Sequence, residues 1–346
     1  MVSTRFPGTD WTPADLPEGT DRGALDAGVE QLFGSPATHG RTLALVAVHD
    51  GKIVFERYDP GHSETSTFIS WSMAKSITHA LVGMAVSDGF LSVSGAGLFP
   101  EWAGDGRSRI TLQHLLNMTS GLEWTEDYVD DAVSDVIEML APGHQPDHAA
   151  FALTKPLVHE PGTHFCYSSG TTNIITRVLS RALGDAPPGN AAMARHIARL
   201  FDAVGMSSAT AKYDRSGNFV GSSFVYATAR DYARFGWLYL NDGVWDGNRV
   251  LPEGWVEHGR TWVADEPETG VGYGAQWWLQ PAVPGSMTAQ GYQGQLTWVV
   301  PDRDLVVVRL GLTDSAVMPN VRDSLVGLIR AFPVQNVPAD KSGVHV

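Results

Sequence analysis

The sequence predicts an α+β fold in which both ends of the chain build one antiparallel sheet, flanked by helices, around a mostly helical inserted region. Two observations support this prediction. Runs rich in β-branched and aromatic residues lie near both ends, whereas helical periodicity dominates the middle. The strand-like runs are residues 42–49, 52–58, 275–279, 296–300 and 305–312.

The N-terminal part is expected to contain an extended arm, a helix and a hairpin. Three prolines block regular structure within residues 1–23, so this arm should lie against the body. Residues 23–33 have the spacing of a helix. Asp50-Gly51 separates the first two strand-like runs and is typical of a tight hairpin turn.

Most other helices are expected between the strand-rich ends. Residues 111–118 form a short amphipathic segment, and Gly121 stands where a glycine would end that helix. Loops rich in proline and glycine separate the helical segments. The predicted helices are 72–88, 111–118, 131–140, 172–183, 190–203, 228–241 and 321–332.

The length of 346 residues exceeds what one compact core usually holds. We therefore expect residues 24–88 and 221–346 to form an α/β domain, and residues 89–220 to form a mostly helical domain. The arm of residues 1–23 precedes both.

Composition excludes several classes of partner. The formal charge of −14 disfavours binding to nucleic acids and to anionic membranes. The single cysteine, Cys166, cannot form an intramolecular disulfide. The sequence shows neither a secretory signal nor an apolar run long enough to span a bilayer, so a cytoplasmic location is expected. His144 and His148 are four residues apart, but Pro146 lies between them, so no metal site or cofactor is predicted.

The candidate nucleophile is Ser72, three residues before Lys75 at the start of a predicted helix. Residues at i and i+3 share a helix face, so the amine can reach the hydroxyl. The positive end of the helix dipole disfavours an ammonium ion there and favours an oxyanion. Such a pair fits a serine nucleophile with a lysine base, although the same spacing also describes a helix-capping serine followed by a solvated lysine.

Two further segments offer groups that a serine and a lysine alone do not provide. A Pro161-Gly162 turn precedes a loop that carries Tyr167, directly before a predicted helix. Farther along, Gly291-Tyr292 precedes a strong strand, and a glycine there allows close backbone approach. A proton-transferring group and backbone donors for an oxyanion are the parts that an acyl-transfer site needs.

The ordered motifs resemble the serine β-lactamase and penicillin-recognising peptidase superfamily, and its class C-like branch in particular. That branch has S-x-x-K, then a tyrosine motif, then a triad ending in glycine on an edge strand; here these are Ser72 to Lys75, Tyr167-Ser168-Ser169 and Ala289-Gln290-Gly291. The resemblance covers about residues 40–330 and implies a β-lactamase/transpeptidase-like fold with the active site between its two parts.

Within the branch, the chain most resembles the 6-aminohexanoate-dimer hydrolase and carboxylesterase subgroup. The Tyr-Ser-Ser motif, Gly291 to Gln295 and the loop of residues 124–128 carry that likeness. Ala289 departs from β-lactamases, which place lysine or histidine there to bind the substrate carboxylate. The resemblance therefore implies a carboxylesterase or amidase that acts on a small ester or amide.

The resemblance also implies roles for individual residues. Ser72 would form an acyl-enzyme while Lys75 and Tyr167 move protons, with the choice of formal base left open. The backbone N–H groups of Ser72 and Tyr292 would bind the oxyanion. The remaining substrate-binding positions implied by the family are Ser169, Tyr128, Gly291 and Gln290.

Other functions remain open at the level of sequence. A β-lactamase or a D-amino-acid peptidase would use the same three motifs. A non-catalytic penicillin-recognition-type binding module would share the fold, but such proteins usually lose the lysine or tyrosine or gain a membrane anchor. The oligomeric state is expected to be a monomer or a homodimer.

Overall fold

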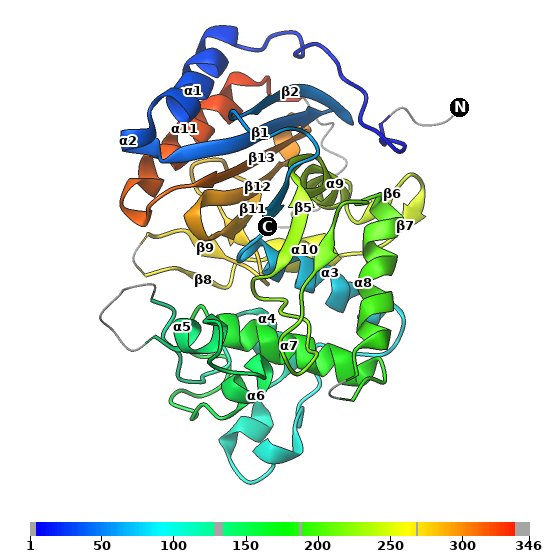
Figure 1. The fold of residues 1–346 in the computed structure, drawn as a ribbon. Helices are drawn as coiled ribbons and strands as arrows, with labels where there is room; N and C mark the ends of the chain where they lie inside the picture. The colour runs from blue at the N-terminus through cyan, green and yellow to red at the C-terminus, as the bar shows by residue number, and fades with distance from the viewer. Residues whose placement is uncertain (1–4, 128–133, 187–188, 268, 336–346) are drawn as a thin grey trace, which may run out of the picture.

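The computed structural model contains one large antiparallel sheet to which both ends of the chain contribute (Figure 1). The structure describes residues 5–127, 134–186, 189–267 and 269–335. Within them, eight strands pair in the order β2-β1-β13-β12-β11-β10-β9-β8, which together with the helical middle confirms the predicted α+β class. The strands are β1 Arg41–His49, β2 Lys52–Tyr58, β8 Ala264–Asp265, β9 Gly272–Tyr273, β10 Trp278–Leu279, β11 Met287–Gly291, β12 Gln295–Val300 and β13 Leu305–Leu312.

The first strand of the chain, β1, lies between β2 and the last strand, β13, near one edge of this sheet. In the pairing of β1 with β13, Val46 stands opposite Val308. The predicted hairpin between β1 and β2 is also present, with Asp50 and Gly51 at φ values of +48° and +71°. A Cβ on Gly51 would lie 1.9 Å from the backbone oxygen of Arg5, so the arm closes over the turn at a distance that only glycine permits.

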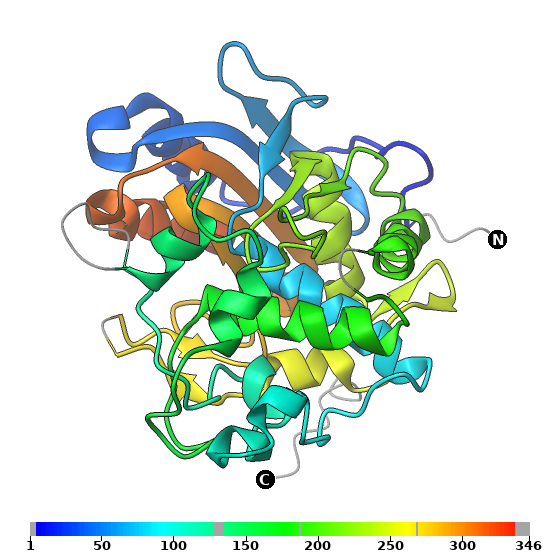
Figure 2. The ribbon, with the colours of Figure 1, turned by 60° about the horizontal axis from the view of Figure 1, so that its bottom comes forward.

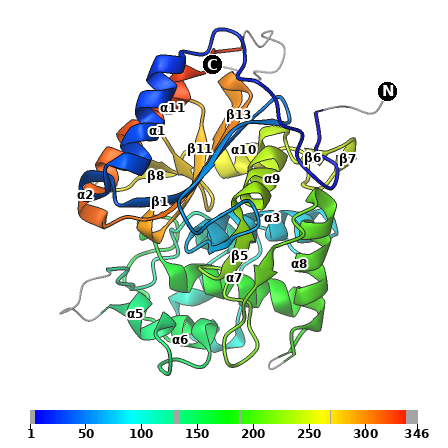
Figure 3. The same cartoon turned by 45° about the horizontal axis from the view of Figure 1, so that its top comes forward.

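Helices cover both faces of the sheet. Leu45 and Val307 belong to a core with α1 (Arg22–Gly34) and α11 (Met318–Ala331), which lie side by side in Figure 3. Val46 and Val308 point the opposite way, into the core shared with α9 (Ala229–Leu240) and α3 (Met73–Ser87). Helix α3, which follows the candidate nucleophile Ser72, therefore packs against this second face of the sheet.

The inserted region is built around α7 (Ser169–Ala182), which contacts α3 as well as α4, α5, α6 and α8. Figure 2 shows α7 lying across this part of the molecule. The other helices are α2 Pro36–His39, α4 Leu112–Leu116, α5 Asp135–Leu140, α6 His148–Leu153, α8 Ala191–Val204 and α10 Trp255–Arg260. The smaller strands are β3 Thr67–Ile69, β4 Thr210–Ala211, β5 Val225–Thr228, β6 Val244–Trp245 and β7 Asn248–Arg249.

Several predicted elements need correction. Helix α4 ends at Leu116, and Gly121 does not cap it; a Cβ there would lie 2.2 Å from the backbone oxygen of His159, so close approach requires this glycine. Gln276 has φ +61°, which shortens the strand expected at 275–279 to β10. The six-residue helices α6 and α10 were not predicted, because segments so short carry little periodicity.

Three further expectations from the sequence concern the helix predicted at 131–140, the division into domains and a membrane-spanning helix. Residues 131–133 of the helix predicted at 131–140 lie outside the described residues. The division into two domains and an arm stays a prediction. None of the helices in the described ranges combines the length and apolar character that a bilayer crossing requires.

A chain of buried hydrogen bonds fastens α3 to its surroundings. His79 Nδ1 lies 2.8 Å from the Tyr239 hydroxyl, His79 Nε2 lies 3.0 Å from His258 Nδ1, and His258 Nε2 lies 2.9 Å from Gln113 Oε1. Burial lowers the pKa of both imidazoles, which favours their neutral forms. Because the amide oxygen only accepts, His258 Nε2 donates to it, and with both rings neutral His79 then donates to His258 and Tyr239 donates to His79.

This chain predicts that the protein loses stability in mild acid. The folded-state pKa of each histidine lies below its unfolded value of 6.5, so the unfolded chain takes up protons first as pH falls through that value. The urea midpoint should therefore drop between about pH 7.5 and about pH 5.5. H258Q should show a smaller drop than the wild type; equal drops would show that the histidine chain does not titrate with folding.

Candidate active site

Ser72 lies just before the first turn of α3 and follows a residue in an unusual backbone conformation. Trp71 has φ +43°, a region that bulky side chains rarely adopt. The turn is anchored by Ser70, whose Oγ donates to the Ser223 carbonyl at 3.0 Å. Ser72 itself has helical angles and makes no capping bond, so its hydroxyl does not take the N-cap role and instead meets Lys75.

Lys75 is the most deeply enclosed charged side chain of the site, with 2% of its surface exposed. Its Nζ lies 2.9 Å from Ser72 Oγ, 2.9 Å from Ser169 Oγ and 3.2 Å from the Ser222 carbonyl oxygen. Burial disfavours the ammonium form and lowers the pKa of Lys75 to about 8. An appreciable fraction of the amine is therefore neutral near physiological pH.

Tyr167 borders the same group of atoms. The Lys75 Nζ lies 4.7 Å from the centroid of its ring, and the phenol interacts with Ser72. The ring packs against Tyr273 and Trp278, with centroid distances of 5.8 Å and 5.1 Å. Desolvation raises the pKa of Tyr167 far above its ordinary value, so the phenol keeps its proton. Tyr167 is thus placed to donate a proton.

Glu126 is a site residue that the sequence analysis missed. Its Oε1 accepts from Ser169 Oγ at 2.5 Å, and its Oε2 accepts from the Ser169 N–H at 2.8 Å and from the Trp124 indole N–H. Glu126 lies in the loop of residues 124–128 that contributed to the family resemblance, but no periodicity or motif marks it. Only the fold brings its carboxylate next to the start of α7.

The third motif lies on β11 and reaches the nucleophile turn. Strand β10 pairs with Met287 and Thr288 only, so residues 289–291 have no partner strand on that side. A Cβ on Gly291 would lie 2.2 Å from the Ser70 carbonyl oxygen. This glycine therefore lets the strand end approach the turn, and the Tyr292 ring meets Trp71 edge-on at 5.7 Å. The predicted pair of oxyanion donors, Ser72 and Tyr292, comes from these two segments.

A buried arginine supports the backbone that carries Tyr292. Arg309 of β13 is 0% exposed, and its guanidinium donates to the carbonyls of Gln293 and Gly294 at 3.2 Å and 2.9 Å. The same group donates to Thr42 Oγ1 and to Thr313 Oγ1. With its donors shared among neutral acceptors, Arg309 ties the loop after Gly291 to the middle of the sheet.

The predicted substrate-binding residues fall into different settings. The Ser169 hydroxyl is engaged by Lys75 and Glu126. Tyr128 lies outside the described residues. Gln290 Nε2 is buried with no hydrogen-bond partner in the described part of the chain. Ala289 has a neutral methyl side chain that is 1% exposed, so this position offers no positive charge. The substrate-binding roles stay predictions.

Other chemistries find no support in the described residues. No group of three or more metal-ligating side chains occurs among residues 5–127, 134–186, 189–267 and 269–335.

The Cys166 thiol contacts the Trp124 carbonyl at 3.6 Å, and burial raises its pKa to about 11. A thiol with so high a pKa is a poor nucleophile at neutral pH.

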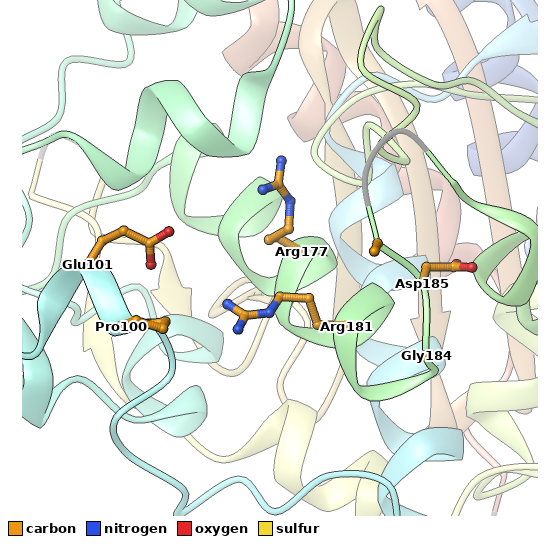
Figure 4. A pocket seen from close by; sticks show the side chains of 7 residues that line it. Pro100, Glu101, Arg177, Arg181, Gly184 and Asp185 are labelled. Atoms are coloured by element: carbon orange, nitrogen blue, oxygen red, sulfur yellow. The ribbon is translucent and has the colours of Figure 1, made fainter.

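A separate cavity of about 370 Å³ lies at the other end of α7 (Figure 4). Arg177 and Arg181 line it together with Glu101 and Asp185. The Arg177 guanidinium is already bound to Asp147. Arg181 is twelve residues along the helix from Ser169, a separation of about 18 Å, so this cavity is not part of the Ser72 site.

Comparison with known proteins identifies the family to which this chain is similar. The family model described as Beta-lactamase matches residues 29–322. The 6-aminohexanoate-dimer hydrolase of Paenarthrobacter ureafaciens is 28% identical over 289 residues, which cover 78% of this chain and 72% of that protein.

Two solved structures share the fold. One, from Bacillus anthracis, is provisionally named a 6-aminohexanoate-dimer hydrolase. It matches with a TM-score of 0.71 at 20% identity, and the matched region covers 96% of this chain and 90% of the Bacillus chain. A D-stereospecific amidohydrolase from a Streptomyces species matches with a TM-score of 0.64 at 15% identity, and the matched region covers 86% of this chain and 97% of the Streptomyces chain. At these identities the structures support the fold alone.

The contact between Gly291 and the nucleophile turn can be tested by adding one methyl group. G291A should lower the free energy of unfolding by about 1–3 kcal/mol, because the new Cβ meets the Ser70 carbonyl. G327A is the matched control: Gly327 is an exposed position of α11 with no atom near its Cβ, so alanine should stabilise by about 0.5–1 kcal/mol. Chemical denaturation measures both, and a neutral G291A would contradict the close approach.

Proposed function

The chain belongs to the beta-lactamase family, and from this premise we propose that it is a serine hydrolase that cleaves carboxylic esters or linear amides through an acyl-enzyme on Ser72. The single observation that carries the proposal is the buried Lys75 amine 2.9 Å from the Ser72 hydroxyl. A lysine enclosed in this way is basic enough to accept a proton yet is not locked in its charged form.

In the proposed first step, Ser72 Oγ attacks the substrate carbonyl carbon and its proton passes to Lys75 Nζ. A bond forms between Oγ and carbon, and the carbonyl electron pair moves onto the oxygen. The N–H groups of Ser72 and Tyr292 would bind this oxyanion; the loss of one such donor typically costs about 10²–10³ in turnover. The tetrahedral intermediate then expels the alcohol or amine, which takes a proton from Tyr167.

The second step releases the acid. The Lys75 ammonium first gives its extra proton to Tyr167, so both groups are again neutral. Water then attacks the acyl carbon while its proton passes to Lys75 Nζ. The tetrahedral intermediate collapses as its bond to Ser72 Oγ breaks, and Oγ takes that proton from Lys75. We assign Lys75 rather than Tyr167 as the base of the first step, because burial lowers the pKa of the lysine to about 8 and raises that of the phenol. Desolvation acts on both groups and favours the neutral form of each.

The chemistry of position 289 supports a preference for esters and linear amides over β-lactams. Ala289 offers no cation for the carboxylate that penicillin-type substrates carry. The relative named for 6-aminohexanoate dimer supports amidase activity on linear aminohexanoate oligomers as the sharper hypothesis. β-Lactam or D-amino-acid peptide hydrolysis would use the same serine and lysine, and both are outcomes of the test.

A substrate panel on one purified sample tests the proposal. We expect p-nitrophenyl esters of short acids to be hydrolysed fastest, 6-aminohexanoate to be released from its linear dimer, and nitrocefin to be hydrolysed least. Esters lead because their leaving groups are better. Ester hydrolysis without release of aminohexanoate would reduce the proposal to a carboxylesterase, and fast nitrocefin hydrolysis would make the protein a β-lactamase.

S72A is the control that identifies the nucleophile. It should abolish hydrolysis of every substrate and labelling by a fluorophosphonate, whereas S92A, at an exposed serine, should behave like the wild type. Normal turnover by S72A would contradict the acyl-enzyme. A wild-type protein that neither reacts with the label nor hydrolyses any member of the panel would instead be a binding module.

A further inference from the structure

The half-buried carboxylate of Glu126 accepts hydrogen bonds through both of its oxygens, and a path of three hydrogen bonds, by way of Ser169 Oγ and Lys75 Nζ, joins it to the Ser72 hydroxyl. We propose that Glu126 is a positioning residue: it makes the Ser169 hydroxyl an obligatory acceptor and thereby aims the lone pair of Lys75 at Ser72. This inference rests on the proposed function of the same site. It assigns a role that none of the three motifs contains.

The single proton of the Ser169 hydroxyl has a fixed direction. A carboxylate can only accept hydrogen bonds, and Glu126 Oε1 lies 2.5 Å from Ser169 Oγ. The hydroxyl proton is therefore directed at Glu126. The backbone N–H of Ser169, which donates to the other carboxylate oxygen at 2.8 Å, fixes the carboxylate in this orientation. Toward any other neighbour, Ser169 Oγ can only accept.

The nitrogen of Lys75 is oriented by its three polar neighbours. A neutral amine has two N–H bonds and one lone pair, and Nζ has three polar neighbours. The Ser222 carbonyl oxygen always accepts, and Ser169 Oγ accepts because of Glu126. These two neighbours take the two N–H bonds, so the lone pair is left facing the third neighbour, Ser72 Oγ, at 2.9 Å. That orientation is the one a general base requires.

After proton transfer the same contacts hold the product of that transfer. The ammonium of Lys75 then donates to both acceptors and to the Ser72 oxygen, so no side chain has to move during the step. Preorganisation of this kind is a principal source of enzymatic rate enhancement. The negative charge of Glu126 also stabilises the ammonium across the Ser169 hydroxyl.

The charge of Glu126 opposes the effect of burial. It raises the pKa of Lys75, whereas desolvation lowers it. Among the described residues, the other titratable groups that respond to Glu126 are Tyr167, Tyr273 and Cys166, and each has a pKa raised so far that it stays protonated near neutrality. Nearby, Lys155 is paired with Asp135. Lys75 is therefore the group whose titration a change at Glu126 should move.

The test compares E126Q with E123Q, which removes the same charge from an exposed glutamate of the same segment. In the wild type, kcat/KM for a p-nitrophenyl ester should rise with pH through about 8, as Lys75 loses its proton. E126Q should move this rise to lower pH, because the charge that raises the pKa is gone. Its plateau should fall by about 10- to 100-fold, because the glutamine amide can donate to Ser169 and release the hydroxyl proton toward Lys75.

S169A separates the effect of the Glu126 charge on the pKa of Lys75 from its effect on the orientation of the lysine lone pair. It removes the acceptor but keeps the charge, so its plateau should fall by a similar factor without a shift of the rise to lower pH. An E126Q circular dichroism spectrum and urea midpoint that match those of E123Q would show that the variant is folded. An E126Q profile that superimposes on that of E123Q would overturn the inference, whereas a wild-type protein without any hydrolytic activity would overturn the proposed function instead.

Discussion

The site depends on the removal of one amine from water. Lys75 is enclosed so completely that its ammonium form loses solvation, yet its hydrogen-bond partners in the described part of the chain are two hydroxyls and a carbonyl rather than a carboxylate. A direct ion pair would restore the charge and make the lysine useless as a base. The carboxylate of Glu126, whose charge raises the pKa of Lys75, acts instead through the neutral hydroxyl of Ser169. The enclosure therefore leaves the pKa of Lys75 near the pH at which a base must work.

The fold maintains this balance by bringing together segments that are far apart in the chain. Helix α3 supplies Ser72 and Lys75, the start of α7 supplies Ser169, and the carbonyl of Ser222 comes from the segment before β5. Gly291 lets β11 touch the turn before Ser72, while Arg309 anchors the loop that follows. Each segment is held by the two cores around the sheet, so the positions of the polar groups follow from apolar packing.

The sequence predicted the parts of this structure that have strong local signals. Alternating and fully apolar runs located β1, β2, β12 and β13, and Asp50-Gly51 located the hairpin. The S-x-x-K spacing and the tyrosine motif located Ser72, Lys75 and Tyr167, which the structure brings together. Glu126 could not be found in this way, because its role comes from a contact with Ser169 across 43 residues of chain. The same reason hid Arg309, whose acceptors lie on three separate segments.

The most direct test of the account is the titration of Lys75 itself. Heteronuclear NMR of protein labelled at the lysine side chains, with K75M to assign the signal, measures its pKa without any substrate. The account predicts a midpoint near 8, well below those of the exposed lysines. A midpoint at the ordinary lysine value of 10.5 would mean that the amine is solvated or ion-paired, and the proposed base would not exist at neutral pH.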